Sequence, residues 1–287
     1  MNKTAIITGA SSGFGLLATV ELARNGFSVI ATMRNLQSKD TIIKLCKQEA
    51  ITSKISFLQL DVTDQKSINH FASQLSQIPS VDILINNAGF AFGGFCEETS
   101  ISEYNEQFDT NFFGLIRVTQ AVLPYIRKQQ SGKIINISSI SGKIGFPGLS
   151  PYVASKHALE GWSECLRLEV KPFGIDVALI EPGSFQTNIW TKGKRIAENS
   201  LLDKSPYSFY MKAIEKELES GKENYGNPQD VARLIVDLCS RKALTKLRYP
   251  IGKGVKLSLF LKNIFPWKVW ERIFYKRLNI GGNGFDN

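Results

Sequence analysis

The sequence predicts an α/β fold: a three-layer, doubly wound parallel sheet with helices on both faces and a small helical extension at the C-terminus. Short β-branched runs alternate with longer segments of helical periodicity over residues 1–240, a pattern typical of parallel strands joined by crossover helices. A glycine-rich turn follows the first strand, and polar or glycine residues follow the later ones. The predicted strands are 5–8, 28–32, 55–60, 81–85, 133–138 and 175–180, and the predicted helices are 13–25, 39–50, 64–77, 103–130, 152–170 and 228–240.

The turn after the first strand is rich in glycine, and the spacing of these glycines indicates a binding function. Gly9, Gly13 and Gly15 lie between the strand at 5–8 and the helical pattern that begins at 13. Glycines there permit a tight turn and let a pyrophosphate approach the backbone, where the helix N-terminus holds it through free N–H groups and its dipole. We therefore expect this loop to bind a dinucleotide cofactor. The loop residues are Gly9, Ser11, Ser12, Gly13, Phe14 and Gly15.

The same turn also matches the Gly-x-Ser-x-Gly elbow of serine hydrolases, at Gly9, Ser11 and Gly13. A hydrolase would need a histidine base for Ser11. His70 lies in a polar helical stretch and His157 adjoins a lysine, so neither is an obvious partner. A hydrolase is therefore the remote alternative.

Capping residues and prolines mark the helix boundaries. Asp64 is placed to cap the third helix, and Asn227 with Pro228 is placed to begin the last one. Pro172 and Gly174 are expected to end the helix that precedes them. These signals agree with the periodicity and support the predicted order of elements.

Distinctive residues follow the later strands. Ligands of doubly wound sheets bind at the carboxyl ends of the strands, so these residues are expected to share one site. Each has an ordinary explanation as a cap or a turn, but their common location favours binding. They are Asp61 and Val62 after the third strand, Asn87, Ala88 and Gly89 after the fourth, Ser139 after the fifth, and Pro182 and Gly183 after the sixth.

Tyr152 and Lys156 lie four residues apart, on one face of a predicted helix. A free phenol titrates near about 10, and a neighbouring cation lowers that pKa by favouring phenolate. The spacing therefore predicts that Tyr152 acts as a general acid or base. Tyr-x-x-x-Lys also occurs by chance in amphipathic helices, so this prediction depends on its agreement with the glycine turn and the strand-end residues.

Composition and charge exclude several functional classes. The chain has 287 residues and a net charge of +9, yet residues 1–240 contain 24 Lys and Arg against 24 Asp and Glu. The excess positive charge lies in residues 241–287, so residues 1–240 lack the strong positive charge that is typical of nucleic-acid-binding domains. The four cysteines are scattered without a Cys-x-x-Cys pair, which predicts neither a metal site nor disulfides and fits the reducing cytoplasm. No stretch is apolar enough to span a membrane.

Two segments depart from the alternating pattern. Within a catalytic domain of residues 1–254, the aromatic-rich insert at 184–226 is expected to form a substrate lid. Residues 255–287 form a basic, amphipathic C-terminal extension. Such a helix can lie in the interface of an anionic bilayer, which would make the protein peripherally membrane-associated. Its apolar face can equally pack over the pocket or against another subunit, and both roles remain open at this stage.

Together these residues resemble the short-chain dehydrogenase/reductase family in its compact, single-domain form with a Rossmann fold. The match covers roughly the first 240 residues, from the glycine turn to Pro182, Gly183 and Thr187. The stretch 159–162, the stretch 181–187 and the basic tail look most like members that act on lipophilic alcohols and ketones, such as hydroxysteroid and retinol dehydrogenases. The resemblance implies an NAD(P)-dependent oxidoreductase, a small lipophilic carbonyl or alcohol substrate, and a homodimer or homotetramer.

The resemblance also implies a role for each matching catalytic position. Tyr152 would exchange a proton with the substrate oxygen while hydride moves between nicotinamide and the carbonyl carbon. Lys156 would lower the pKa of the phenol and hold the nicotinamide ribose, and Ser139 would orient the substrate oxygen. Asn111 would hold a water that links Lys156 to solvent. No family position is replaced by an inert residue, which disfavours the alternative of a catalytically silent nucleotide-sensing or scaffold protein.

The end of the second strand predicts NADP(H) over NAD(H). NAD users generally place an acidic residue there to hold the ribose hydroxyls. Here the strand is followed by Arg34, whose guanidinium could bind a 2′-phosphate in bidentate fashion. Ser12 could add a hydroxyl to the same phosphate.

Overall fold

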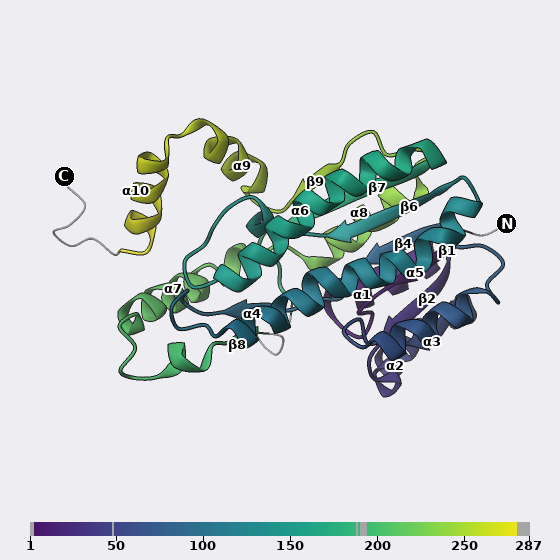
Figure 1. Cartoon of the computed structure of the whole chain (residues 1–287), viewed down its shortest axis with the longest axis horizontal. Coiled ribbons are helices and arrows are strands. Elements are labelled where there is room, and N and C mark those ends of the chain that lie inside the picture. Colours follow the sequence, from purple (N-terminus) through teal and green to yellow (C-terminus); the bar gives the residue numbers. More distant parts are fainter. Residues whose placement is uncertain (1–2, 48, 188, 190–193, 280–287) are drawn as a thin grey trace.

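The fold is centred on a seven-stranded parallel sheet in the order β3-β2-β1-β4-β6-β7-β9 (Figure 1). The computed structural model describes residues 3–47, 49–187, 189 and 194–279, so parts of the predicted lid and tail (188, 190–193 and 280–287) lie outside it. The sheet confirms the predicted α/β class. Its strands are β1 (Thr4–Ile7), β2 (Ser28–Met33), β3 (Ile55–Gln59), β4 (Ile83–Asn86), β6 (Gly132–Ile137), β7 (Ile175–Pro182) and β9 (Arg248–Ile251).

Helices cover both faces of the sheet, as Figure 1 shows. One face carries α1 (Gly13–Arg24), α2 (Lys39–Lys47) and α8 (Pro228–Ser240), and the other carries α3 (Gln65–Leu75), α5 (Gly114–Lys128) and α6 (Ser150–Val170). Neighbouring residues of β1 serve opposite layers: Ile7 belongs to the apolar cluster with α1 and α8, and Ile6 to the cluster with α3 and α5. Because both faces are covered, the strands read as continuous apolar runs rather than alternating ones.

The predicted capping residues lie at helix ends in the structure. The Asp64 carboxylate accepts from the backbone N–H groups of Lys66 and Ser67 at the start of α3. Asn227 caps α8 by accepting from Gln229 N. After α6, Gly174 adopts a φ of 69°, a left-handed conformation in which glycine is favoured.

The predicted helix at 103–130 is divided. Helix α4 (Ile101–Phe108) is followed by a π-helical turn (Asp109–Phe113) before α5 begins. A π-helical turn contains one extra residue per turn, and such turns occur frequently at functional sites. The spacing of apolar residues did not reveal the π-helical turn, because one additional residue rotates the apolar face of the helix without interrupting the helical pattern.

Several short elements were not predicted. β9 pairs with β7 and is only four residues long, with an arginine and a proline among them. β5 (Ala91–Gly93) and β8 (Lys194–Ile196) form a separate two-stranded parallel sheet. The predicted lid contains α7 (Ser208–Ser220). The predicted helical extension at the C-terminus is present and consists of α9 (Val255–Ile264) and α10 (Trp267–Arg277). Among the helices described, none combines the length and apolarity that crossing a bilayer requires.

Candidate active site

A cavity of about 740 Å³ lies at the carboxyl ends of the strands. β1 pairs with β2 on one side and β4 on the other, so the winding reverses there and opens a crevice. Nearly all predicted site residues line this cavity. They are Gly9, Ser11, Ser12, Gly13, Phe14, Arg34, Asp61, Val62, Asn87, Ala88, Gly89, Asn111, Ser139, Tyr152, Lys156, Pro182, Gly183 and Thr187.

Gly15 is the predicted residue that does not line the cavity. It is buried in the first turn of α1, where a Cβ would lie 2.4 Å from Gly9 O and 2.5 Å from Asn87 Nδ2. Its role in this structure is therefore close packing of the helix against the loop. Gly9 and Gly13 are different, because their φ angles of 66° and 55° lie in the left-handed region.

The start of α1 faces the cavity with its polar groups available. Ser12 precedes the helix in an extended conformation, and its hydroxyl makes no capping hydrogen bond. A Cβ at Gly13 would meet nothing within 4 Å, so the space beside this turn is open. An anion placed there would meet the N–H groups and the positive end of the helix dipole.

Thr8 and Asn87 hold the glycine loop in place. Thr8 Oγ1 accepts hydrogen bonds from Asn87 N at 2.9 Å and from Ala88 N at 3.0 Å. Asn87 Nδ2 donates back to Thr8 O at 2.9 Å and Gly9 O at 3.1 Å. Thr8 was predicted as the first residue of the glycine-turn segment, but its bonds to Asn87 and Ala88 were not, because they depend on β1 and β4 being neighbours in the sheet.

Tyr152, Ser139 and Lys156 come together on one side of the cavity. Tyr152 and Lys156 lie on the first two turns of α6, Ser139 follows β6, and all three side chains are buried. Lys156 Nζ donates to Ile137 O at 2.8 Å and lies 5.8 Å from the centre of the Tyr152 ring. Ser139 Oγ accepts from Ser141 N at 3.1 Å, which fixes the hydroxyl beside the phenol.

Burial controls the ionisation of both groups of the Tyr152–Lys156 pair. It raises the pKa of Tyr152 to about 12, and a hydrogen bond with Ser139 partly offsets this. It lowers the pKa of Lys156 to about 8, against the opposing influence of Glu160. The net shift of the phenol pKa is therefore upward, whereas a lowering by Lys156 was expected, because loss of water disfavours the charged form. The phenol of Tyr152 is therefore protonated at neutral pH, and the amine of Lys156 titrates about one pH unit above neutral.

Asn111 occupies the π-helical turn and is fully enclosed. Its Oδ1 accepts from Phe90 N at 3.1 Å, and its Nδ2 donates to Phe90 O at 3.0 Å. The carboxamide therefore fixes the link between β4 and β5 at the cavity wall. Ser155 Oγ lies 3.5 Å from the same nitrogen, which brings Asn111 next to the helix of Tyr152.

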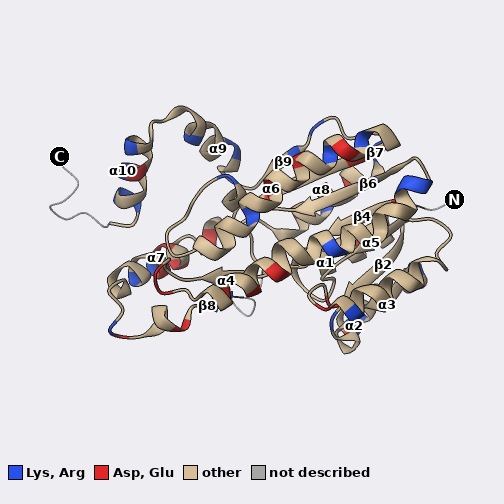
Figure 2. Ribbon diagram, viewed as in Figure 1, with Lys and Arg blue, Asp and Glu red and all other residues tan. Residues whose placement is uncertain are grey.

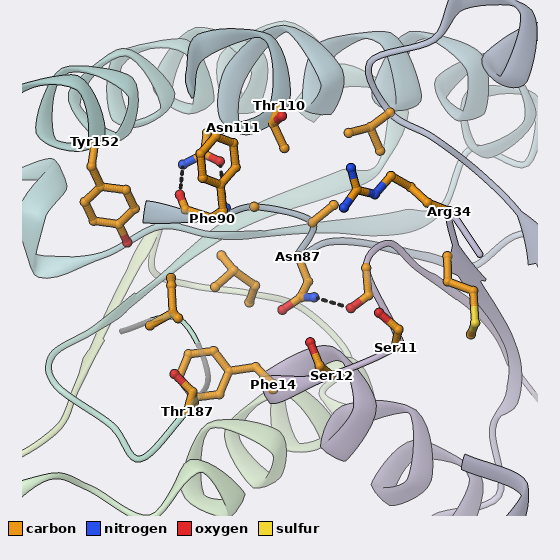
Figure 3. Close-up of a pocket in the computed structure, with 18 of the residues that line it drawn as sticks. Ser11, Ser12, Phe14, Arg34, Asn87, Phe90, Thr110, Asn111, Tyr152 and Thr187 are labelled. Carbon is orange, nitrogen blue, oxygen red and sulfur yellow. Dashed lines mark hydrogen bonds between the residues drawn. The ribbon is translucent and has the colours of Figure 1, made fainter. Parts of the chain in front are cut away.

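Arg34 lies across the cavity from Tyr152 and directs its guanidinium into it (Figure 3). It follows β2 directly, and its carbonyl accepts from Gln59 Nε2 at 3.0 Å. No carboxylate among the described residues forms an ion pair with it. The carboxylate of Asp61, which also lines the cavity, bonds within its own turn: Oδ1 accepts hydrogen bonds from Thr63 N at 2.9 Å and from Thr63 Oγ1 at 2.7 Å.

The hydrolase alternative lacks a base. His70 belongs to α3, and His157 Nδ1 lies 3.0 Å from Val153 O on α6. Neither of these two histidines, the only ones in the sequence, lines the cavity beside Ser11. Across the residues that the structure describes, no His, Cys, Asp or Glu cluster is suited to hold a metal ion.

A buried carboxylate network lies behind Lys156, and sequence analysis missed it. Glu160 accepts from Ser138 Oγ at 2.5 Å and from Arg248 Nε at 2.8 Å. Glu181, on β7, lies 3.5 Å from the same Arg248 nitrogen, too far for a hydrogen bond. Burial and the neighbouring Glu160 raise the pKa of Glu181 to about 7. Arg248 also pairs with Glu164 at the protein surface.

Known proteins resemble this chain over nearly its whole length. YusZ of Bacillus subtilis, an oxidoreductase of uncharacterized activity, is 50% identical over 96% of this chain and 98% of its own. The 3-ketodihydrosphingosine reductase of Bacteroides thetaiotaomicron is 38% identical, with 90% of each chain covered. Human retinol dehydrogenase 8 is 36% identical, with 86% of this chain and 82% of its own covered.

Solved structures confirm the fold. A short-chain dehydrogenase from Streptomyces avermitilis matches with a TM-score of 0.79 at 33% identity, over 97% of both chains. ElxO with NADP bound matches with a TM-score of 0.72 at 27% identity, over 90% of this chain and 100% of its own. The family model for short chain dehydrogenases matches residues 3–196. The chain therefore belongs to the short-chain dehydrogenase/reductase family and is an oxidoreductase.

Proposed function

We propose that this protein is an NADP(H)-dependent oxidoreductase that interconverts a lipophilic ketone or aldehyde with its alcohol, with Tyr152 as general acid and base. One observation carries the proposal. The buried phenol of Tyr152, the Ser139 hydroxyl and Lys156 meet on one side of the cavity, and the glycine turn and Arg34 form the other side. This arrangement separates a proton-transfer centre from a phosphate-binding one.

The residues present fit a dinucleotide. Gly9 and Gly13 hold the left-handed turn that lets a pyrophosphate approach the backbone, and the N-terminus of α1 opens behind them. Ser12 and Arg34 are the polar side chains positioned for a 2′-phosphate. ElxO, which shares the fold, was solved with NADP, in line with this preference.

Proton transfer follows from the geometry of the buried trio. Bound nicotinamide would supply or accept hydride at the carbonyl carbon. Ser139 orients the substrate oxygen, and Tyr152 delivers its proton to that oxygen during reduction. A pKa of about 12 keeps the phenol protonated at neutral pH, as an acid must be. The Lys156 ammonium stabilises the phenolate left behind, and its pKa of about 8 allows it to return a proton near physiological pH.

Replacing Arg34 by aspartate should reverse the cofactor preference. Arg34→Asp removes a charge-assisted contact to the 2′-phosphate and adds a carboxylate for the ribose hydroxyls. A hydrogen bond to a charged group contributes about 1.5–3 kcal/mol, so the NADPH/NADH ratio of kcat/KM should fall by roughly 10- to 100-fold or more. Lys44→Asp, on the exposed side of α2 away from the cavity, is the matched control. An unchanged ratio in Arg34→Asp would place phosphate recognition elsewhere.

Activity should rise with the apolar length of the substrate. Phe90, Phe185 and Ile189 line the cavity, and two relatives are named for the lipid-like substrates 3-ketodihydrosphingosine and retinol. In a series of unbranched 2-ketones with NADPH, each added methylene that is buried contributes about 0.8 kcal/mol, or roughly four-fold in kcat/KM. A flat series would contradict the lipophilic substrate. Absence of turnover with any carbonyl or alcohol would favour the catalytically silent alternative.

A further inference from the structure

Helix α9 presents its apolar side chains to solvent. Leu257, Phe260 and Ile264 are 61%, 59% and 56% exposed, respectively. Their spacing of three and four residues places them in one stripe along the helix. A surface helix ordinarily packs its apolar stripe against the core of the protein. Helix α9 instead exposes this stripe to solvent.

Helix α10 exposes further apolar side chains and also packs against the rest of the protein. Trp267 is 59% exposed, and Val269 and Ile273 are also exposed. Trp270, one turn after Trp267, is buried, and Phe274 packs against Phe146 with ring centres 5.7 Å apart. We call the six exposed apolar residues the tail surface: Leu257, Phe260, Ile264, Trp267, Val269 and Ile273.

The hairpin of α9 and α10 is anchored to the predicted lid. Arg277 forms an ion pair with Glu217 of α7 at 2.6 Å. The Phe146–Phe274 contact is a second link between α10 and the rest of the protein, and neither Phe146 nor Glu217 lines the cavity.

Basic residues are spread along α9 and α10, as Figure 2 shows. Residues 255–279 contain six Lys and Arg against one Glu, whereas residues 1–240 are neutral overall. Lys262 Nζ lies 3.8 Å above the centre of the Trp267 ring, so positive charge and exposed aromatic surface are in direct contact. The other cations are Lys256, Lys268, Arg272 and Lys276, together with Arg277, which forms the ion pair with Glu217.

We propose that the tail surface docks on an anionic lipid bilayer. The exposed apolar stripe of α9, the exposed Trp267 and the lysines and arginines of the same two helices suit the interface between acyl chains and anionic headgroups. A second copy is the less suitable occupant, because a two-fold contact would bring two basic surfaces of the same sign together. The proposal concerns binding alone and does not depend on the substrate or the cofactor.

Vesicle co-sedimentation of the full-length protein tests the proposal. We expect binding to phosphatidylglycerol/phosphatidylcholine vesicles, none to phosphatidylcholine alone, and weakening as ionic strength rises. A combined Lys256→Glu, Lys268→Glu and Arg272→Glu variant removes three cations. Each contributes roughly five-fold near the surface, so its partition coefficient should fall by about 100-fold or more.

A second variant tests the apolar stripe. Leu257→Ser, Phe260→Ser and Ile264→Ser together should weaken vesicle binding by more than about ten-fold, because large apolar side chains no longer enter the interface. The change is confined to exposed positions, and circular dichroism should show an unchanged fold. The matched control combines Lys44→Glu, Leu45→Ser and Lys47→Glu on α2, an exposed set of the same chemistry in the neutral body. This control should bind as the parent does.

Three results would overturn the proposal. One is equal binding to neutral and anionic vesicles, which would remove the role of charge. Another is equal loss of binding in the α2 control. The third is a dimer that light scattering detects in the parent and that the serine variant dissociates, with no vesicle binding by either. That outcome would make the tail surface a subunit contact.

Discussion

Tyr152→Phe should lower the rate of the chemical step by roughly 10²- to 10⁴-fold, the usual contribution of a positioned general acid. The substitution removes one oxygen from a buried ring and leaves the packing of α6 intact. NADPH affinity should be unchanged, because the glycine turn and Arg34 lie across the cavity. Single-turnover reduction of a ketone, with NADPH binding followed by fluorescence, separates these two effects.

Tyr125→Phe is the matched control for this experiment. Its hydroxyl donates to Ala72 O at 3.4 Å, on α3, and does not line the cavity. It should retain the parent rate. If Tyr152→Phe kept a single-turnover rate within ten-fold of the parent, another group would have to supply the proton.

Arg248→Met should destabilise the fold strongly. The arginine is the cation that hydrogen-bonds to Glu160 and faces Glu181, two carboxylates with almost no exposed surface. Removing one partner of a buried ion pair typically costs about 3–5 kcal/mol, since the remaining charges stay buried and uncompensated. Urea denaturation at pH 8 should show a loss of that size in the free energy of unfolding.

The loss in the free energy of unfolding caused by Arg248→Met should be smaller at pH 5 than at pH 8. The pKa of Glu181 is already raised to about 7 from the ordinary 4.5, so the folded protein binds a proton more tightly than the unfolded chain does. The resulting stabilisation is fully present below about 4.5 and is lost as the pH rises through about 7. Without Arg248, the pKa of Glu181 rises further, and protonation at pH 5 relieves the repulsion between the carboxylates.

Arg233→Met provides the comparison. Arg233 pairs with Asp230 at 3.3 Å on α8, where both side chains are more than half exposed. Exposed pairs contribute about 0–1 kcal/mol, so little change is expected. Equal effects of the two substitutions would mean that the Arg248 network contributes no more than an ordinary surface pair.

The sequence predicted the parts of the site that follow from local pattern and sheet topology. The glycine turn, the strand-end residues and the Tyr152–Lys156 spacing each occupy a few consecutive residues, and parallel strands bring their ends to one edge. The direction of the Tyr152 pKa could not be predicted, because it depends on burial that many distant residues create. The Arg248–Glu160 bond joins residues 88 positions apart across β9, which no periodicity indicated.

The position of β9 also bears on aggregation. β7 is buried along all eight of its residues, and without β9 it would be the open edge of the sheet, ready to pair with another chain. β9 is a poor template for such pairing: it is four residues long, and Pro250 has no N–H to offer a neighbour. Arg248 fastens this strand to α6 through Glu160 and Glu164. The side chain that neutralises a buried carboxylate pair thus also keeps the protective edge strand in place, and cells producing Arg248→Met should accumulate insoluble protein.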